Sequence, residues 1–215
     1  RSSLRAEPAG AGPCVPCETL SNLKIADTNL LSAAVVPGTD SLPAHCRVLG
    51  YVRPAINFEI VLPLEEWNGK YLANGCGGYC GSVGDNAYGL GRYYVASSMD
   101  SGHWGESFFD GRWAYHDRVA EVDWAHRAVH ETARVSKALI ESFYGRTPDQ
   151  SYFVGCSTGG RMAAMEASRY PDDFDGIVCG APALDYTGLV AIFASWVVQA
   201  NTDEAGMNII TRADL

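Results

Sequence analysis

The sequence lacks several features that assign a protein quickly to a class. It has no run of apolar residues near the roughly 18 that a membrane-spanning helix needs, and no Asn-x-Ser/Thr sequon for N-glycosylation. Basic residues are few, because 16 Lys and Arg stand against 25 Asp and Glu, which gives a net charge of −9. This balance disfavours nucleic acids and anionic membranes as partners. Residues 1–8 do not resemble a signal peptide, so we expect any leader to have been removed.

What the chain does contain is a strong chemical signal at Gly155–Gly160, a Gly-x-Ser-x-Gly sequence followed by a second glycine. The β-branched and aromatic run at 150–154 predicts a buried strand before it. Good helix formers at 161–170 predict a helix after it. A strand, this motif and a helix form the context of a nucleophile elbow, which would expose the hydroxyl of Ser157 and direct the Thr158 N–H toward an oxyanion. The alternative is a glycine-rich turn that merely joins a strand to a helix.

Histidine is missing from the part of the chain where such a serine would need it. The five histidines are His45, His103, His116, His126 and His130, and none follows Ser157. In α/β-hydrolases the acid and then the histidine come after the serine. A serine hydroxyl is a poor nucleophile without a base within hydrogen-bond reach. We therefore expect Asp and His to be supplied from outside these residues, on a second chain or on a C-terminal segment.

The seven cysteines are an odd number, which leaves a free thiol or a bond to something outside the chain. Cys156 is the candidate for the outside bond, because it stands beside the expected nucleophile, with its side chain predicted to face away from solvent. Within the chain, Cys17–Cys46 is the first structural disulfide to expect, and a bond between Cys76 and Cys80 would fix the loop between them. Disulfides favour an exported protein, secreted or periplasmic.

The alternation of predicted strands and helices indicates an α/β protein with a mostly parallel sheet and flanking helices. Together with the nucleophile elbow, it predicts the α/β-hydrolase fold. Strands are expected at 57–62, 70–73, 93–96, 150–154 and 176–180. Helices are expected at 118–143, at 161–170 and from 188 to 199. We expect residues 1–16 to be a mobile N-terminal segment and 17–215 to be the N-terminal part of the catalytic domain. The sheet is predicted to be incomplete here, because the strands that would carry the Asp and the His are missing.

Six motifs, in the expected order, resemble those of the tannase and feruloyl esterase family. They are residues 42–48, 67–70, 75–81, 155–161, 169–176 and 180–183. The resemblance implies an exported serine esterase with an α/β-hydrolase core and a large lid. It also implies that Ser157 is the nucleophile and that Cys156 bonds to a cysteine following the catalytic histidine. The acid, the histidine, that cysteine and the lid would lie beyond Leu215. No cofactor is expected in this chain, and the family's Ca²⁺ site would lie in the missing lid.

The glycine-rich loop at 75–81 follows an early strand, where α/β-hydrolases place their second oxyanion donor. Glycine lets backbone N–H groups approach a ligand closely. The N–H of Gly77, or else that of Gly78, is therefore expected to act with the N–H of Thr158. A flexible glycine hairpin is the structural alternative. A zinc site on the C-x₃-C pair is disfavoured because no second pair of ligands is evident, and we expect no metal.

Two other histidine patterns are weaker candidates for a site. Asp100 and His103 could serve as the acid and base of a different triad order, but chain order disfavours them, and the resembling family has a similar structural segment. His126 and His130 lie four residues apart on a predicted helix. Without a third ligand they indicate a solvated helix face rather than a metal site.

These features predict hydrolysis of small aromatic carboxylate esters through an acyl-enzyme on Ser157. The resemblance implies feruloyl and other hydroxycinnamoyl esters of plant cell-wall sugars, and Thr158 after the nucleophile favours that branch. Galloyl esters of tannins and terephthalate monoesters are the alternatives within the family. A non-catalytic phenol- or carbohydrate-binding relative and a thiol-dependent hydrolase or redox protein using Cys156 are alternatives of other classes.

Overall fold

The structure is a computed structural model that describes residues 12–107 and 109–214. It divides into two compact units, one ending at Pro182 and the other beginning at Ala183. Residues 1–11, most of the segment predicted to be mobile, lie outside the described residues. At the start of the described chain, the backbone N–H of Cys14 donates to the carbonyl of Phe143 over 2.7 Å.

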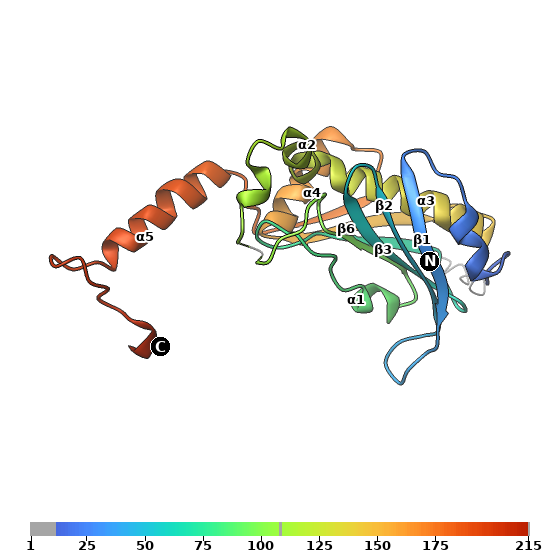
Figure 1. Cartoon of the computed structure of the whole chain (residues 1–215). Helices are drawn as coiled ribbons and strands as arrows, with labels where there is room; N and C mark the ends of the chain where they lie inside the picture. The colour runs from blue at the N-terminus through green and yellow to red at the C-terminus, as the bar shows by residue number, and fades with distance from the viewer. Residues whose placement is uncertain (1–11, 108, 215) are drawn as a thin grey trace, which may run out of the picture. The chain divides into compact units, whose positions relative to one another are not determined.

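The first unit is built on a seven-stranded mixed sheet with the order β1-β2-β3-β5-β4-β6-β7 (Figure 1). The strands are β1 (Thr28–Val36), β2 (His45–Val52), β3 (Ile56–Pro63), β4 (Lys70–Asn74), β5 (Val95–Met99), β6 (Gln150–Cys156) and β7 (Gly176–Gly180). The β1–β2, β2–β3 and β3–β5 pairs are antiparallel, and β5–β4, β4–β6 and β6–β7 are parallel. Because parallel strands end at one edge, the segments that follow β4 and β6 meet there.

The helices of this unit lie on both faces of the sheet, with α2, α3 and α4 on one face and α1 on the other (Figure 1). They are η1 (Cys17–Asn22), α1 (Ala87–Leu90), η2 (Arg112–Ala114), α2 (Arg118–Val122), η3 (Asp123–Arg127), α3 (Ala128–Tyr144) and α4 (Thr158–Arg169). The helix predicted over 118–143 is interrupted, because η3 is a π-helical turn between α2 and α3. Its end is as predicted, since Gly145 adopts a left-handed conformation and its N–H caps the carbonyl of Glu141.

The five strand predictions hold except at one boundary, but β1 and β2 were not predicted from the sequence. The strand expected at 93–96 begins at Val95 instead, because Tyr93 has a φ of 60° and cannot continue an extended chain. The strands predicted at 57–62 and 70–73 are β3 and β4, and they are not neighbours in the sheet, because β5 lies between them. All five residues of β5 are buried, as its central position requires.

Buried aromatic residues and one disulfide fix the ends of the sheet. Trp67 stacks on Tyr144 with 4.1 Å between ring centroids, and the Tyr144 hydroxyl donates to the carbonyl of Pro63 over 2.7 Å. Cys17 and Cys46 form the disulfide expected from the sequence, with a Cα–Cα distance of 5.6 Å. Both cysteines are buried, so the bond fastens η1 to β2 inside the core.

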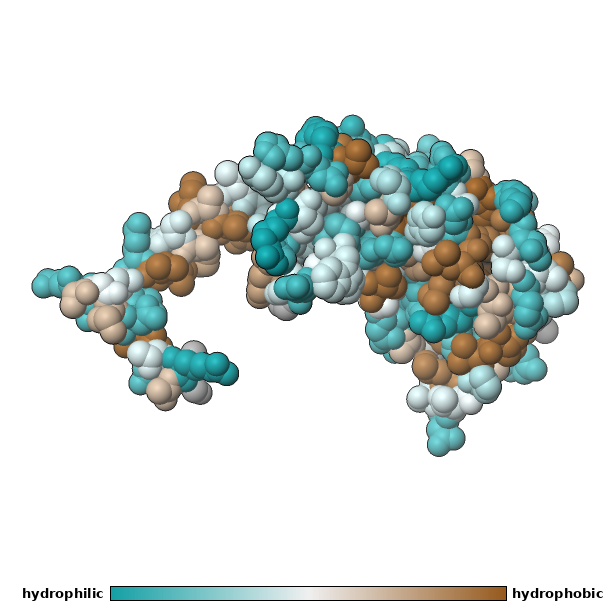
Figure 2. All heavy atoms as spheres, viewed as in Figure 1, coloured by the Kyte–Doolittle hydropathy of each residue, from teal (hydrophilic) through white to brown (hydrophobic). Residues whose placement is uncertain are grey.

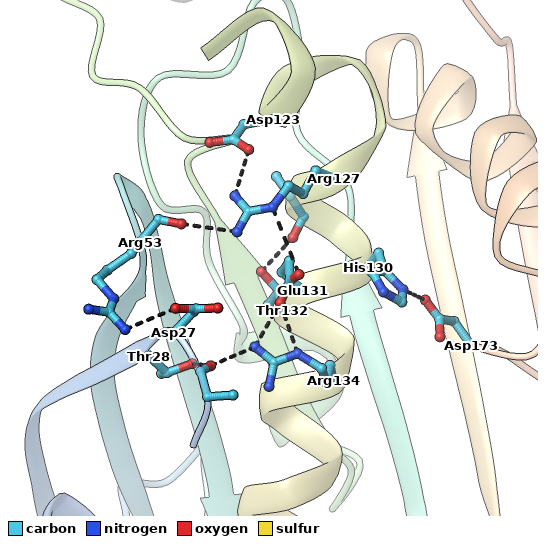
Figure 3. A network of polar contacts seen from close by, with 12 residues as sticks. Asp27, Thr28, Arg53, Asp123, Arg127, His130, Glu131, Thr132, Arg134 and Asp173 are labelled. Carbon is cyan, nitrogen blue, oxygen red and sulfur yellow. Dashed lines mark hydrogen bonds and ion pairs between the residues drawn. The ribbon is translucent and has the colours of Figure 1, made fainter. Parts of the chain in front are cut away.

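A polar network along α3 fastens this helix to its neighbours (Figure 3). Arg127 donates to the buried Asp123 over 2.8 Å and to the carbonyl of Arg53 over 3.0 Å. On another side of the helix, His130 Nδ1 lies 2.7 Å from Asp173 Oδ2. In the Arg127–Asp123 pair the carboxylate is buried, so loss of Arg127 would leave a buried charge unpaired and should cost more than loss of a partner from an exposed pair.

The face that carries the two helix histidines is half-buried rather than fully solvated as predicted. His126 Nδ1 lies 2.8 Å from the Tyr170 hydroxyl, and the ring of His130 stacks on that of Tyr170 at 4.1 Å. The chain that leaves α4 therefore shields both rings in part. No group of three or more His, Cys, Asp or Glu side chains in the described residues could hold a metal ion.

Glu166 of α4 places a carboxyl group in the core. Its side chain is fully buried, and the carboxyl group of Asp173 lies close enough to interact with it. Burial, and then the negative charge of Asp173, raise the pKa of Glu166 from 4.5 to about 8. The group is therefore neutral in the folded protein at pH 7, although it would be ionised in the unfolded chain.

We expect Glu166→Gln to flatten the fall in stability between about pH 4.5 and pH 8. Because the folded pKa lies above the unfolded one, the contribution of Glu166 is complete below pH 4.5 and is lost as the pH rises through about 8. The loss is on the order of 3–5 kcal/mol, and a neutral amide does not undergo it. Unfolding midpoints measured from pH 5 to 9 check this, with exposed Glu65→Gln as the control. Parallel pH profiles for wild type and Glu166→Gln would contradict the prediction.

The second unit, considered by itself, contains η4 (Gly188–Phe193), α5 (Ala194–Ala200) and η5 (Arg212–Asp214). The apolar helix predicted from 188 to 199 is confirmed. None of its described residues is buried, and Figure 2 shows hydrophobic residues along it. The large exposed side chains of this helical part are Leu189, Val190, Ile192, Phe193, Trp196, Val197 and Val198. No helix in the described ranges has both the length and the apolar character that crossing a membrane requires.

Candidate active site

Ser157 occupies a sharp turn between β6 and α4, which is the strand–turn–helix context that the sequence predicts. Its backbone has φ 60° and ψ −117°, a conformation that is costly for a residue other than glycine. The Ser157 N–H donates to the carbonyl of Gly180 on β7 over 3.0 Å, which holds the turn in place. The residue is exposed, so its hydroxyl is accessible. Strained positions of this kind cluster at functional sites.

The glycines around Ser157 are required by close backbone approach. A Cβ on Gly155 would overlap the carbonyl of Gly159, and one on Gly160 would overlap the carbonyl of Gly180. A Cβ on Gly75 would lie 2.7 Å from the Cα of Gly159. The first turn of α4 therefore packs directly against β7 and against the glycine-rich loop that follows β4.

The loop at 75–81 is closed into a tight turn beside the serine. A disulfide joins Cys76 and Cys80 with a Cα–Cα distance of 5.4 Å, and the Cys80 N–H donates to the carbonyl of Gly77 over 2.9 Å. Gly78 has a φ of 57°. The buried hydroxyl of Thr158 donates to the carbonyl of Gly78 over 2.5 Å. The structure thus brings together Thr158, Gly77 and Gly78, the residues that the sequence singled out as oxyanion donors.

The alternative acid–base pair is not assembled. The carboxylate of Asp100 accepts hydrogen bonds from the backbone N–H groups of Asn57 and Gly102 and from the Asn57 side chain. Burial outweighs these bonds and raises the pKa of Asp100 to about 6. His103 is buried against Trp113, with ring centroids 3.9 Å apart, and burial lowers its pKa. Among the described residues, no histidine forms a hydrogen bond with Ser157.

Three cysteines of the described part form no disulfide: Cys14, Cys156 and Cys179. Cys156, the residue before Ser157, is exposed, so the prediction that its side chain would face away from solvent was wrong. Its partner on the neighbouring strand is Gly180, which has no side chain to cover it. An exposed thiol at this position is accessible to a bond with another segment.

Arg161 is a residue of the site that sequence reasoning missed. It is 7% exposed, and its guanidinium lies 3.8 Å from the ring centroid of Trp124. It donates to the carbonyls of Trp124 and Ala125 over 2.8 and 2.7 Å. The sequence could have identified Arg161 by its position. It lies one turn into a helix whose first turn must face the sheet, where a charged side chain needs partners. Tyr79, in the glycine-rich loop, contacts Trp124 and Trp113 with ring centroids 6.0 and 6.3 Å apart.

A sheet of this order with helices on both faces, and an exposed serine in a strained turn after an inner parallel strand, define the first unit as an α/β-hydrolase fold. A crystal structure of feruloyl esterase B from Aspergillus oryzae matches 88% of this chain and 41% of its own, with 30% identity and a TM-score of 0.78. The structure of an esterase from the same organism matches 87% of this chain and 41% of its own, with 28% identity and a TM-score of 0.79.

Sequence comparisons identify the family to which this α/β-hydrolase fold belongs. The tannase and feruloyl esterase family matches residues 41–215. An uncharacterized esterase of Xanthomonas campestris is 36% identical over 189 residues, which are 80% of this chain and 33% of that protein. A probable feruloyl esterase B-2 of Aspergillus flavus is 37% identical over 157 residues, 70% of this chain and 29% of that protein. The chain belongs to the tannase and feruloyl esterase family, and it spans about a third of the length of these relatives.

Proposed function

We propose that this chain carries the nucleophile and the oxyanion hole of a secreted or periplasmic esterase that hydrolyses small aromatic carboxylate esters. The observation that carries the proposal is the exposed Ser157, held in a strained turn beside a glycine-rich loop that the Thr158 side chain contacts. Family membership supports the ester-hydrolase class. The relatives named feruloyl esterase support hydroxycinnamoyl esters as the substrate class.

In the proposed reaction, the Ser157 hydroxyl attacks the ester carbonyl while a histidine takes its proton. The backbone N–H of Thr158 and one from Gly77 or Gly78 stabilise the oxyanion, and each such donor typically contributes about 3–4 kcal/mol. The tetrahedral intermediate expels the alcohol, which receives the proton from the histidine, and leaves the aromatic acyl group on Ser157. Water, activated by the same histidine, then hydrolyses this ester and releases the acid.

The histidine and its acidic partner are proposed to come from outside these residues. In support, the five histidines precede the serine, and those in the described part form no hydrogen bond with it. The exposed thiol of Cys156 is suited to bond with a cysteine near that histidine, which would fasten the base beside the nucleophile. The resemblance to the family further implies a lid, where any Ca²⁺ would bind.

A serine-directed fluorophosphonate and a panel of esters test the proposal on the complete protein that carries these residues. We expect a single adduct on the peptide containing Ser157, and hydrolysis of hydroxycinnamoyl esters faster than that of galloyl esters or terephthalate monoesters. Faster hydrolysis of galloyl esters or of terephthalate monoesters would instead assign the enzyme to that substrate class of the family. Absence of both the adduct and ester turnover would refute the esterase proposal and favour a phenol- or carbohydrate-binding relative. Labelling of Cys156 by iodoacetamide, with loss of turnover, would favour the thiol-dependent alternative.

A further inference from the structure

The hydroxyl of Thr158 has a contact that is separate from the oxyanion role expected of its backbone N–H. Its Oγ1 donates to the carbonyl of Gly78 over 2.5 Å, across 80 residues of sequence. The Thr158 side chain is fully buried, so the donor side of this bond is shielded from water. It joins the first residue of α4 to the loop expected to supply the second donor.

A second connection between α4 and the same loop runs through aromatic rings. Arg161, three residues after Thr158, holds its guanidinium 3.8 Å from the ring centroid of Trp124 and donates to the Trp124 and Ala125 carbonyls. Trp124 in turn lies against Tyr79, the residue after Gly78, with ring centroids 6.0 Å apart. Trp124 and Ala125 belong to the π-helical turn η3, and such turns occur frequently at functional sites.

We propose that Thr158, through its hydroxyl, and Arg161, through its guanidinium, are positioning residues. They hold the glycine-rich loop at 75–81, here called the oxyanion loop, at a fixed distance from Ser157. Thr158 fastens the loop through Gly78, and Arg161 fastens it through Trp124 and Tyr79. The two contacts start from the same turn of α4 and end on adjacent residues of the loop, so the loop cannot shift without breaking one of them. The disulfide between Cys76 and Cys80 makes the loop itself a single stiff piece.

The inference deepens the proposed function and rests on it. Oxyanion donors act on the transition state, so a loop displaced by a fraction of an ångström loses kcat, whereas substrate binding in the ground state is hardly affected. Removing one donor outright costs about 10²- to 10³-fold in kcat, so a displaced donor should cost less than that. A change confined to kcat therefore distinguishes positioning from general weakening of the fold.

The test uses Thr158→Val and Thr158→Ser in the complete protein. Valine keeps the shape and the backbone N–H of threonine but loses the hydroxyl, whereas serine keeps the hydroxyl. We expect Thr158→Val to lower kcat on a hydroxycinnamoyl ester about 10- to 100-fold with KM within about 2-fold. Thr158→Ser should restore kcat to within about 3-fold of wild type, and amide hydrogen exchange at 77–80 should be faster only in the valine variant.

Thr132→Val is a matched control, because the buried Thr132 hydroxyl likewise donates to a carbonyl, that of Ala128, but on α3. It should change neither kcat nor exchange at 77–80. Arg161→Lys keeps the charge but not the planar fork, and should lower kcat in the same way. Combined with Thr158→Val, it should lower kcat by less than the product of the single effects, because both residues hold one loop.

The inference is overturned if Thr158→Val leaves both kcat and exchange at 77–80 unchanged, or if serine fails to restore them. It is also overturned if Thr132→Val has the same effect. Failure of the proposed function gives a different result, namely a wild-type protein that neither turns over esters nor reacts with the phosphonate. Exchange at 77–80 would still respond to Thr158→Val in that case, so the two ideas fail separately.

Discussion

Ser157→Ala is expected to lower kcat for ester hydrolysis by at least about 10⁴-fold in the complete protein, with little change in KM. In the proposed reaction the oxygen of the Ser157 hydroxyl forms the acyl-enzyme, and the methyl group of alanine cannot replace it. Loss of a triad serine typically costs up to about 10⁶-fold in kcat, and the residual rate comes from the oxyanion hole and from binding. Turnover and phosphonate labelling, measured on the same preparations, check this prediction.

The control for this change is Ser168→Ala on the same helix. Ser168 is exposed, and its hydroxyl donates to the carbonyl of Met165 within α4. Its replacement should leave turnover and labelling at wild-type values. A Ser157→Ala protein that keeps a tenth or more of the wild-type kcat would show that another residue is the nucleophile. Cys156, adjacent in sequence and exposed, would then be the first to examine by alkylation.

Gly155→Ala is expected to prevent the first unit from folding stably. The new Cβ would overlap the carbonyl of Gly159, and a backbone atom in a packed helix cannot move aside as a flexible side chain can. Relief requires that α4 move away from β6, which would break its contacts with the sheet. We expect a loss of more than about 4 kcal/mol in the free energy of unfolding, the range that marks severe backbone or core disruption. Urea unfolding followed by far-UV circular dichroism measures it.

Gly84→Ala serves as the comparison for this second prediction. A Cβ there would lie 3.6 Å from the Cβ of Ser98, an ordinary contact distance. The change should alter stability by less than about 1 kcal/mol. If Gly155→Ala and Gly84→Ala unfold at the same urea concentration, the elbow is looser than the structure indicates, and the strain at Ser157 cannot be maintained by close packing.

The elbow could be predicted from sequence because its determinants are local. The residues that make the strand, the turn and the helix are contiguous from 150 to 169, and the glycines report the close approach that the turn needs. The same holds for the end of α3, where Gly145 follows the last helical residue. The Cys17–Cys46 disulfide could also be predicted, because a separation of 29 residues lets the chain between the two cysteines form a loop that brings them together.

Other features depend on residues far apart in sequence, and sequence reasoning missed or misjudged them. His126 and His130 have the spacing of a helix surface, yet they contact Tyr170 and Asp173, which follow them by 44 and 43 residues respectively. Asp100 and His103 have the appearance of a catalytic pair, but Asn57 accounts for much of the carboxylate's hydrogen bonding. Nothing in the periodicity of α4 separates the buried Glu166 from an ordinary surface glutamate.

The sequence by itself determined the turn that carries Ser157, the glycine-rich loop beside the parallel strands and the family, because each depends on short contiguous motifs. The tertiary structure decided how these parts are held together. The hydroxyl of Thr158 reaches Gly78 across 80 residues, and Arg161 reaches Trp124 across 37. Such contacts arise when the sheet order brings β4 beside β6, and no local pattern specifies which side chains then meet.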